Sequence, residues 1–152
     1  MKLKIGDKAP EFKGIDENEN PISLSDFKGK SVILYFYPKD STPGCTNEAC
    51  NLRDNYQMWL DKGYVVIGVS PDSVKSHQKF KAKHELPFPL ISDTEKIIIK
   101  EFGAWGLKKL YGREYEGLLR STFVINGDGI ITNIFEKVKT KDHTNQILET
   151  IK

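Results

Sequence analysis

"SVILYFYPKDSTPGCTNEAC", residues 31–50, joins a strand to a helix and contains both cysteines of the chain. Its first residues form a dense run of β-branched and aromatic side chains closed by a proline, which predicts a buried central strand. Thr42 can then serve as the N-cap of a helix, with Pro43 at the first helical position. The stretch therefore predicts a strand, a short turn and a helix, with Cys45 and Cys50 near the start of that helix.

The rest of the sequence alternates between strand and helix patterns. We expect the first helix to run over 43–60, followed by a strand at 64–70, a helix from Ser73 to His84, a short strand at 88–92, a short helix at 94–103, a hairpin over 120–138 that turns at Asn126 to Gly129, and a final amphipathic helix over 142–152. This order indicates an α/β fold whose central mixed sheet is flanked by helices, with parallel crossovers first and an antiparallel hairpin last. No repeat or linker divides the sequence, so we interpret residues 1–152 as a single domain.

Length and charge exclude several classes of protein. A chain of 152 residues buries about 68–70% of its unfolded surface and needs no crosslink to hold its fold. The formal net charge of +2 is too small for a nucleic-acid-binding surface. No apolar run has the length of a signal peptide or a membrane span, so we expect a cytoplasmic protein without a membrane partner. Thiols stay reduced in that compartment, so a close cysteine pair indicates catalysis or metal binding.

Cys45 lies at about the third position of the predicted helix, where backbone N–H groups lack partners and the helix dipole is positive. Such a position favours a thiolate, although a small buried apolar cysteine is the alternative interpretation. Cys50 follows five residues later, and in an intact helix such residues have Cα atoms ~8.6 Å apart, beyond the ~7 Å that a disulfide tolerates. A bond between the two requires the helix to open, and the poor helix formers within 43–55 predict that this segment does so.

Two other uses of a cysteine pair fit the sequence less well. A zinc site needs about four ligands, whereas the chain offers two cysteines and three scattered histidines. A thioredoxin-type dithiol site has two residues between its cysteines, whereas four separate Cys45 from Cys50. We therefore expect no metal, and a general dithiol–disulfide oxidoreductase and a non-catalytic redox sensor remain as alternative functions. The histidines, which we expect at the surface, are His77, His84 and His143.

Several motifs resemble those of one known family. Pro38, Thr42 and Cys45 match the P-x-x-x-T-x-x-C pattern of peroxiredoxins, and Cys50 resembles the resolving cysteine of their bacterioferritin comigratory, or Q-type, class. The similarity extends over essentially the whole chain through further segments, namely GDKAPEF at 6–12, FGAWG at 102–106 and RSTFVI at 120–125. The resemblance implies a thioredoxin-like fold and a thiol-dependent peroxidase.

The same resemblance implies a role for individual residues. Cys45 would be the nucleophile that attacks a hydroperoxide and becomes a sulfenic acid. Cys50 would condense with that sulfenic acid to a disulfide, which thioredoxin or a thioredoxin-like reductant would reduce. Thr42, Arg120 and local backbone N–H groups would orient the peroxide, and neither a metal nor an organic cofactor is implied. The supporting residues are Pro38 and Glu48.

Three aromatic residues near these motifs could line an apolar entrance to the site. Phe36, Tyr37 and Trp105 have spacings that are more typical of core residues, and we interpret them as core. The sequence leaves the preferred peroxide open, hydrogen peroxide or an organic one. We expect a monomer, with a dimer as the alternative, because no long exposed apolar segment stands out.

Overall fold

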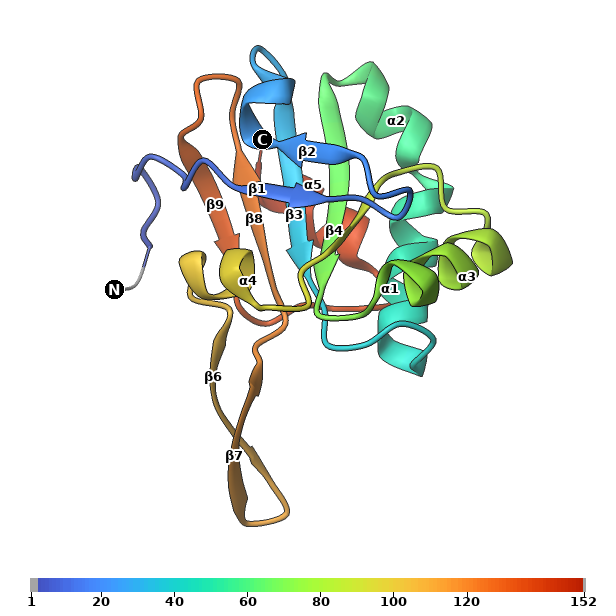
Figure 1. Cartoon of the computed structure of the whole chain (residues 1–152). Helices are drawn as coiled ribbons and strands as arrows, with labels where there is room; N and C mark the ends of the chain where they lie inside the picture. Colours follow the sequence, from blue (N-terminus) through green and yellow to red (C-terminus); the bar gives the residue numbers. More distant parts are fainter. Residues whose placement is uncertain (1–2, 152) are drawn as a thin grey trace.

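A mixed five-stranded sheet forms the centre of the fold, as a computed structural model that describes residues 3–151 shows (Figure 1). Its strands are β3 (Ser31–Phe36), β4 (Tyr64–Ser70), β5 (Leu90–Ser92), β8 (Ser121–Ile125) and β9 (Ile131–Phe135), in the order β5-β4-β3-β8-β9. β3 and β5 are parallel to β4, whereas β8 is antiparallel to both β3 and β9. The expected mixed sheet, with parallel crossovers first and an antiparallel hairpin last, is confirmed.

The helices and the remaining strands surround this sheet (Figure 1). The helices are α1 (Pro43–Asp54), α2 (Tyr56–Asp61), α3 (Val74–His84), α4 (Ile97–Glu101), α5 (His143–Thr150) and the 3-10 helix η1 (Leu24–Phe27). An N-terminal antiparallel pair consists of β1 (Lys13–Ile15) and β2 (Pro21–Ser23). Each helix expected from the sequence is present in part or in full, and Lys152 at the end of the last one lies outside the described residues.

Alternating side chains of β3 fill two separate cores. Val32, Leu34 and Phe36 pack on one face of the sheet with residues from α4 and β2. Ile33 and Tyr35 pack on the other face with residues from α1, α2, α3 and α5. Both faces of this strand are therefore buried, which explains why its sequence is a continuous apolar run rather than an alternating one.

The first helix is not continuous over 43–60, as the sequence predicted, but breaks at Asn55. The Asn55 side chain donates a hydrogen bond to the carbonyl oxygen of Asn51 at 2.8 Å. Its backbone N–H bonds to Leu52 at 3.3 Å, three residues back, rather than continuing the four-residue pattern. Because asparagine competes for backbone hydrogen bonds in this way, the helix ends and α2 starts anew.

The short helix α4 is also shorter than the predicted 94–103. The Asp93 carboxylate accepts hydrogen bonds from the N–H groups of Ile97 at 3.1 Å and Ile99 at 2.8 Å. Lys96, just before the helix, has a positive φ of 61°, which ends any helical path from residue 94. A side chain that precedes the segment therefore sets where the helix begins.

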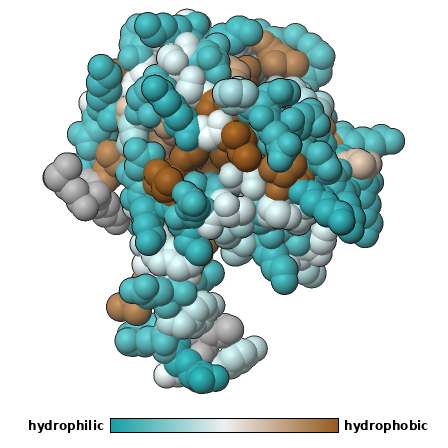
Figure 2. All heavy atoms as spheres, viewed as in Figure 1, coloured by the Kyte–Doolittle hydropathy of each residue, from teal (hydrophilic) through white to brown (hydrophobic). Residues whose placement is uncertain are grey.

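A long hairpin for which the sequence analysis assigned no element projects from the body of the molecule (Figure 1). It consists of β6 (Trp105–Leu110) and β7 (Arg113–Leu118), joined by Tyr111 and Gly112 with φ values of 51° and 77°. Two successive positive φ angles are typical of tight hairpin turns. The glycine of the Tyr-Gly pair was the sequence feature that indicated this turn. Its surface is mainly hydrophilic (Figure 2).

Candidate active site

Cys45 lies at the third position of α1, at the carboxyl end of the central strand β3. Its side chain is only 1% exposed, and its sulfur accepts a hydrogen bond from Arg120 Nη2 at 3.1 Å. Arg120 directly precedes β8, whose Ser121 lies opposite Phe36 at the end of β3. The pairing of two strands therefore places the guanidinium beside the head of the helix.

Gly44 makes room for this guanidinium. A Cβ atom at position 44 would lie 3.3 Å from Arg120 Nη2, which is tighter than most such contacts. Glycine is a poor helix former, so Gly44 is one of the residues within 43–55 that predict a helix able to open. Its second role is to let the helix backbone approach the cation, because any larger residue would press on it.

Glu48 binds the second terminal nitrogen of the Arg120 guanidinium. Arg120 Nη1 donates to Glu48 Oε1 at 2.6 Å, and the Glu48 side chain is fully buried one helical turn after Cys45. Burial lowers the pKa of Arg120, but Glu48 and Cys45 outweigh it and leave the pKa raised. Burial raises the pKa of Glu48 to about 7, against the opposing charge of Arg120. A permanent cation is thus held between a sulfur and a carboxyl group of shifted pKa.

Thr42 occupies the N-cap position of α1, but its side chain does not cap the helix. Its hydroxyl donates instead to the carbonyl oxygen of Lys39 at 2.8 Å. With its proton used in this way, Thr42 Oγ1 presents acceptor lone pairs near the start of α1. Pro38 precedes this loop and is half-buried at the end of the strand.

A buried polar network anchors the loop between β3 and α1. Asp40 accepts hydrogen bonds from Tyr37 Oη at 2.6 Å and Ser76 Oγ at 2.8 Å, and its Oδ2 lies 2.7 Å from His77 Nδ1. The Asp40 N–H donates to Asp72 at 2.7 Å. Asp40, Asp72 and His77 come close enough together to suggest a metal site, yet each already has hydrogen-bond partners among the cluster, the backbone or neighbouring hydroxyl groups.

The expectation that His77 lies at the surface is wrong, because its side chain is fully buried. Its Nε2 lies 2.9 Å from the carbonyl oxygen of Ile91, so the ring donates there while Nδ1 faces Asp40. Burial lowers the pKa of His77, but the Asp40 carboxylate outweighs it and raises the pKa overall. The sequence did indicate that His77 is buried, because it lies three residues before Phe80, on the apolar face of α3.

His143 was also expected at the surface, and it too is fully buried, directly behind Glu48. Gln146 receives the backbone N–H of Lys139 on its Oε1 and donates from Nε2 to Lys137, which fixes the orientation of its amide. His143 Nδ1 must therefore donate to Gln146 Oε1, at 2.9 Å. The position of His143 four residues before the buried Ile147 was the missed signal.

The second ring nitrogen of His143 faces the active site. Nε2 lies 2.8 Å from Thr122 Oγ1 and 3.7 Å from Glu48 Oε2. Burial, and less strongly the charge of Arg120, lower the pKa of His143 to about 4. Glu48 Oε2 has no hydrogen-bond partner within residues 3–151. A neutral imidazole therefore lies behind a carboxyl group that itself holds a proton over part of the neutral range.

Cys50 lies on the same helix, but its surroundings differ. It is half-buried and unbonded to Cys45, and its sulfur lies 3.8 Å from His84 Nδ1 at the end of α3. His84 is half-buried rather than fully at the surface. The geometry thus places the two cysteines against different elements, β8 for Cys45 and α3 for Cys50.

The aromatic residues have structural positions, as expected for Phe36 and Tyr37. Phe36 packs in one core and Tyr37 in the other. Trp105 is partly buried against the first core, and the Lys96 ammonium lies 5.1 Å from the centre of its ring. These contacts are typical of packing and of a cation–π interaction rather than of a substrate site.

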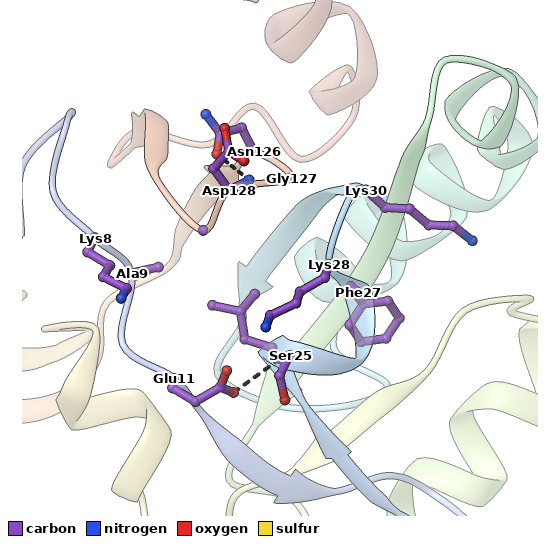
Figure 3. Close-up of a pocket in the computed structure, with 12 residues that line it drawn as sticks. Lys8, Ala9, Glu11, Ser25, Phe27, Lys28, Lys30, Asn126, Gly127 and Asp128 are labelled. Atoms are coloured by element: carbon purple, nitrogen blue, oxygen red, sulfur yellow. Dashed lines mark hydrogen bonds between the residues drawn. The ribbon is translucent and has the colours of Figure 1, made fainter.

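Two of the cavities within residues 3–151 lie at opposite ends of β8. One of about 530 Å³ is formed by the segment before β3 and the turn after β8, and Figure 3 shows Glu11 and Ser25 hydrogen-bonded beside it. Neither cysteine lines it. The other, of about 210 Å³, is lined by Arg120, Ser121 and Glu136 together with Gly103 and apolar residues. Only the second cavity therefore shares a residue with the cysteine site.

Comparisons with known proteins agree with this geometry. The family model described as "AhpC/TSA family" matches residues 5–134. The chain therefore belongs to the AhpC/TSA family.

Within residues 3–151 no helix is long and apolar enough to cross a membrane.

Individual relatives show which class within this family the chain resembles. "Peroxiredoxin Bcp" of Bacillus subtilis is 48% identical over 152 residues, covering 100% of this chain and 97% of its own, and that of Escherichia coli is 41% identical over 150 residues, covering 99% and 96%. A mutant of Xylella fastidiosa PrxQ has a TM-score of 0.92 at 33% identity, covering 99% of this chain and 96% of its own. A structure of the Xanthomonas campestris bacterioferritin comigratory protein has a TM-score of 0.87 at 33% identity, covering 97% and 94%. The chain is a peroxiredoxin of the Bcp, or Q-type, class, with the thioredoxin fold and the thiol peroxidase activity of that class.

Proposed function

We propose that this chain reduces hydrogen peroxide and organic hydroperoxides with Cys45 as the nucleophile, Cys50 as the resolving thiol, and thioredoxin or a similar protein as the reductant. The observation that carries the proposal is the 3.1 Å hydrogen bond from Arg120 to the buried sulfur of Cys45. It combines a fixed cation with the head of a helix at one thiol. Both features favour a thiolate and attract an electron-rich oxygen.

The first step forms one bond and breaks another. The Cys45 thiolate attacks an oxygen of the hydroperoxide, the S–O bond forms and the O–O bond breaks. The released alkoxide or hydroxide takes up a proton and leaves as alcohol or water, while the cysteine becomes a sulfenic acid. The sulfur is oxidised and the peroxide is reduced by two electrons.

Ionisation alone does not explain such catalysis. An ordinary thiol is about 3% ionised at pH 7, so complete ionisation raises the rate by at most roughly thirtyfold. The remaining acceleration requires donors aimed at the oxygen on which charge develops. Arg120 and the free N–H groups at the head of α1 are those donors, and Thr42 Oγ1 accepts a hydrogen bond from the peroxide O–H.

The second step requires α1 to open. Cys50 lies five residues after Cys45 on the helix, and the Cα atoms of such residues are ~8.6 Å apart. A disulfide tolerates at most ~7 Å, so the thiol of Cys50 can reach the sulfenic acid only after the first turns unwind. Condensation then gives a disulfide and water, and exchange with a dithiol of the reductant restores both thiols.

The substrate class follows from the cavity beside Arg120. Its apolar lining can hold the organic part of an alkyl hydroperoxide while the guanidinium binds the peroxide oxygens. A structure of the related Xanthomonas campestris protein concerns its alkyl peroxide reduction activity. This likeness supports organic hydroperoxides as substrates beside hydrogen peroxide. The apolar residues of the cavity are Leu3, Phe102, Leu119, Phe123 and Ile134.

We place the enzyme in the cytoplasm as a single-domain monomer without metal or organic cofactor. The proposed cycle needs reduced thiols and a dithiol reductant, which that compartment supplies. The formal charge of +2 is too small to favour nucleic acid. The exposed large apolar side chains are spread over the N-terminal segment, α2, α4 and the hairpin, which supports a monomer over a dimer.

The test is peroxide consumption coupled to thioredoxin and its reductase, measured for the wild type, Cys45→Ser and Cys50→Ser. Full catalytic turnover is expected only in the wild type, none in Cys45→Ser, and little in Cys50→Ser. An insulin-reduction assay run in parallel separates a general dithiol–disulfide oxidoreductase, which would reduce insulin efficiently. A redox sensor would be oxidised once and would not turn over, and that result would overturn the proposal.

A further inference from the structure

The surroundings of Cys50 point to a function for a histidine outside the Cys45 site. Cys50 Sγ lies 3.8 Å from Nδ1 of His84, within the range of a hydrogen bond to sulfur. His84 is the last residue of α3, 34 positions away in the sequence, so tertiary structure alone brings the two together. The resolving thiol therefore has a potential base in contact with it.

The position of His84 is fixed by contacts on two sides. Arg53 Nη1 donates to the backbone carbonyl oxygen of His84 at 2.8 Å, which ties α1 to the end of α3. The ring of Phe80 lies 5.2 Å from the His84 ring, with an edge-to-face angle of 69°. The imidazole is therefore held in place beside the sulfur.

We infer that His84 accepts the proton of the Cys50 thiol and thereby supplies the thiolate that resolves the oxidised Cys45. The inference rests on the proposed function, in which Cys50 attacks a sulfenic acid. In the tautomer that carries its proton on Nε2, the Nδ1 lone pair of His84 faces the thiol. The Arg53 guanidinium, on the turn that follows Cys50, places a positive charge near the sulfur.

Burial and the charges around His84 keep its ring neutral, so one ring nitrogen carries a lone pair. Burial, followed by the charges of Lys83 and Arg53, lowers the pKa of His84 below its ordinary value. Arg53 is itself paired with Asp54 at 2.8 Å, and Glu85 follows His84 in the chain. At pH 7 the ring is therefore an acceptor rather than a cation.

The resolving step joins the sulfurs of Cys50 and Cys45 and releases water. Cys50 gives its proton to His84 Nδ1, and its thiolate sulfur attacks the sulfenic sulfur of Cys45 once α1 opens. The S–S bond forms and the S–O bond breaks, and the released hydroxide takes a proton from solvent to become water. His84 returns the proton it took to solvent. The Cys50 sulfur is oxidised and the Cys45 sulfur is reduced, so no further reactant is needed.

The test separates the two half-reactions. Reduced protein is mixed with one equivalent of hydrogen peroxide, quenched at intervals, and analysed by mass spectrometry for the sulfenic acid, as its dimedone adduct, and for the Cys45–Cys50 disulfide. In His84→Gln we expect sulfenic acid formation at the wild-type rate and disulfide formation about tenfold slower at pH 7, within the roughly thirtyfold that ionisation can supply. The matched control is Lys79→Gln, an exposed position on the same helix, which should resolve at the wild-type rate.

The pH profile and a rescue experiment distinguish a base from a mere contact. Resolution in His84→Gln should rise about tenfold per pH unit between pH 6 and 8, as ordinary thiol ionisation requires, whereas the wild type should be nearly flat. Imidazole added to His84→Ala should restore part of the rate. If the contact only keeps α1 closed, His84→Gln and His84→Ala will form the disulfide faster than the wild type. A rate of disulfide formation in these variants that equals or exceeds that of the wild type overturns the inference.

Failure of the underlying function gives a different result. If the wild type forms a sulfenic acid but never a Cys45–Cys50 disulfide, Cys50 is not the resolving thiol and the inference falls with it. If the wild type forms that disulfide and the His84 variants form it equally fast, only the role of His84 is wrong.

Discussion

Two cysteines on one helix, five residues apart, lie in different surroundings. Cys45 is 1% exposed and faces a permanent cation, Arg120, which directly precedes β8, the strand paired with β3. Cys50 is half-buried and faces a neutral base, His84, which comes from the end of a helix. The elements packed against α1 therefore determine the chemistry of each thiol, whereas the helix itself determines only their spacing.

The largest expected effect on activity comes from replacing each cysteine by serine. Cys45→Ser should lose all peroxidase activity, because it removes the nucleophile. Cys50→Ser should still react once with peroxide and give a sulfenic acid that dimedone traps, but lose most thioredoxin-supported turnover. Mass spectrometry after a single turnover measures both. Equal loss of the first turnover in the two variants would break the comparison.

The next effect concerns the cation that faces Cys45. Arg120→Ala should slow the reaction with peroxide by more than the roughly thirtyfold that ionisation explains, because it also removes donors to the breaking O–O bond. Arg120→Lys should restore only part of the rate, because a lysine ammonium lacks the planar guanidinium with which Arg120 also binds Glu48. Arg113→Ala, at an exposed arginine on β7, is the matched control and should react normally.

A titration of Cys45 ionisation in these variants sharpens the prediction. Stopped-flow kinetics gives the second-order rate with peroxide, and ultraviolet absorbance of the thiolate gives the ionised fraction. If the loss in Arg120→Ala matches the loss of thiolate, Arg120 acts through ionisation alone and the proposed contact with peroxide is wrong.

A smaller, local effect should accompany oxidation. The sequence analysis predicts that 43–55 opens, but Asn51 anchors α1 to the last helix, because it accepts the Thr144 N–H at 2.7 Å and donates to the carbonyl oxygen of Lys141 at 3.3 Å. We therefore expect amide exchange in the disulfide form to be about tenfold faster or more over 43–50 and to change less beyond. The strands β3 and β4 should stay protected in both forms.

Hydrogen exchange read by mass spectrometry on reduced and oxidised protein checks this expectation. Unchanged protection over 43–50, together with proof of an intramolecular Cys45–Cys50 bond, would mean that resolution does not require the helix to open.

The smallest effect is on stability, and it concerns the pair behind Cys45. Glu48 has a pKa raised from 4.5 to about 7, so its contribution is fully present below pH 4.5 and is lost as pH rises through 7. His143 has a pKa lowered from 6.5 to about 4, so its contribution is present above pH 6.5 and is lost as pH falls through 4. Between pH 4.5 and 6.5 the two slopes oppose each other, at up to ~1.4 kcal/mol per pH unit each.

Single substitutions should expose the two opposing slopes. In Glu48→Gln the free energy of unfolding should rise more steeply with pH across this window than in the wild type, and in His143→Gln it should fall. Urea unfolding at a series of pH values measures the slopes. Parallel curves for all three proteins would show that neither group has a shifted pKa.

The fold was largely predictable where local patterns and tertiary structure agree. The strands at 31–36 and 64–70 are buried on both faces, so their apolar runs are unbroken and easily recognised. The β6–β7 hairpin was not recognised, because a projecting ribbon buries little and carries a weak apolar pattern. The break at Asn55 depends on side-chain hydrogen bonds within one turn, which spacing alone does not reveal.

The histidines show most clearly what one-dimensional analysis misses. His77 and His143 are both fully buried, although the sequence analysis placed them at the surface. A carboxylate partner raises the pKa of His77, whereas burial beside Arg120 lowers that of His143. Their partners Asp40 and Glu48 lie in the stretch around Cys45, far away in the sequence.

Local spacing, capping and motifs were enough to predict the class of protein, the alternation of strands and helices, and the position of both cysteines on one helix. The groups that face those cysteines became visible only in the folded structure. Arg120 reaches Cys45 through the antiparallel pairing of β8 with β3, and His84 reaches Cys50 through the packing of α3 against α1. These partners are 75 and 34 residues away, so only long-range packing, which no local propensity records, could bring them into contact.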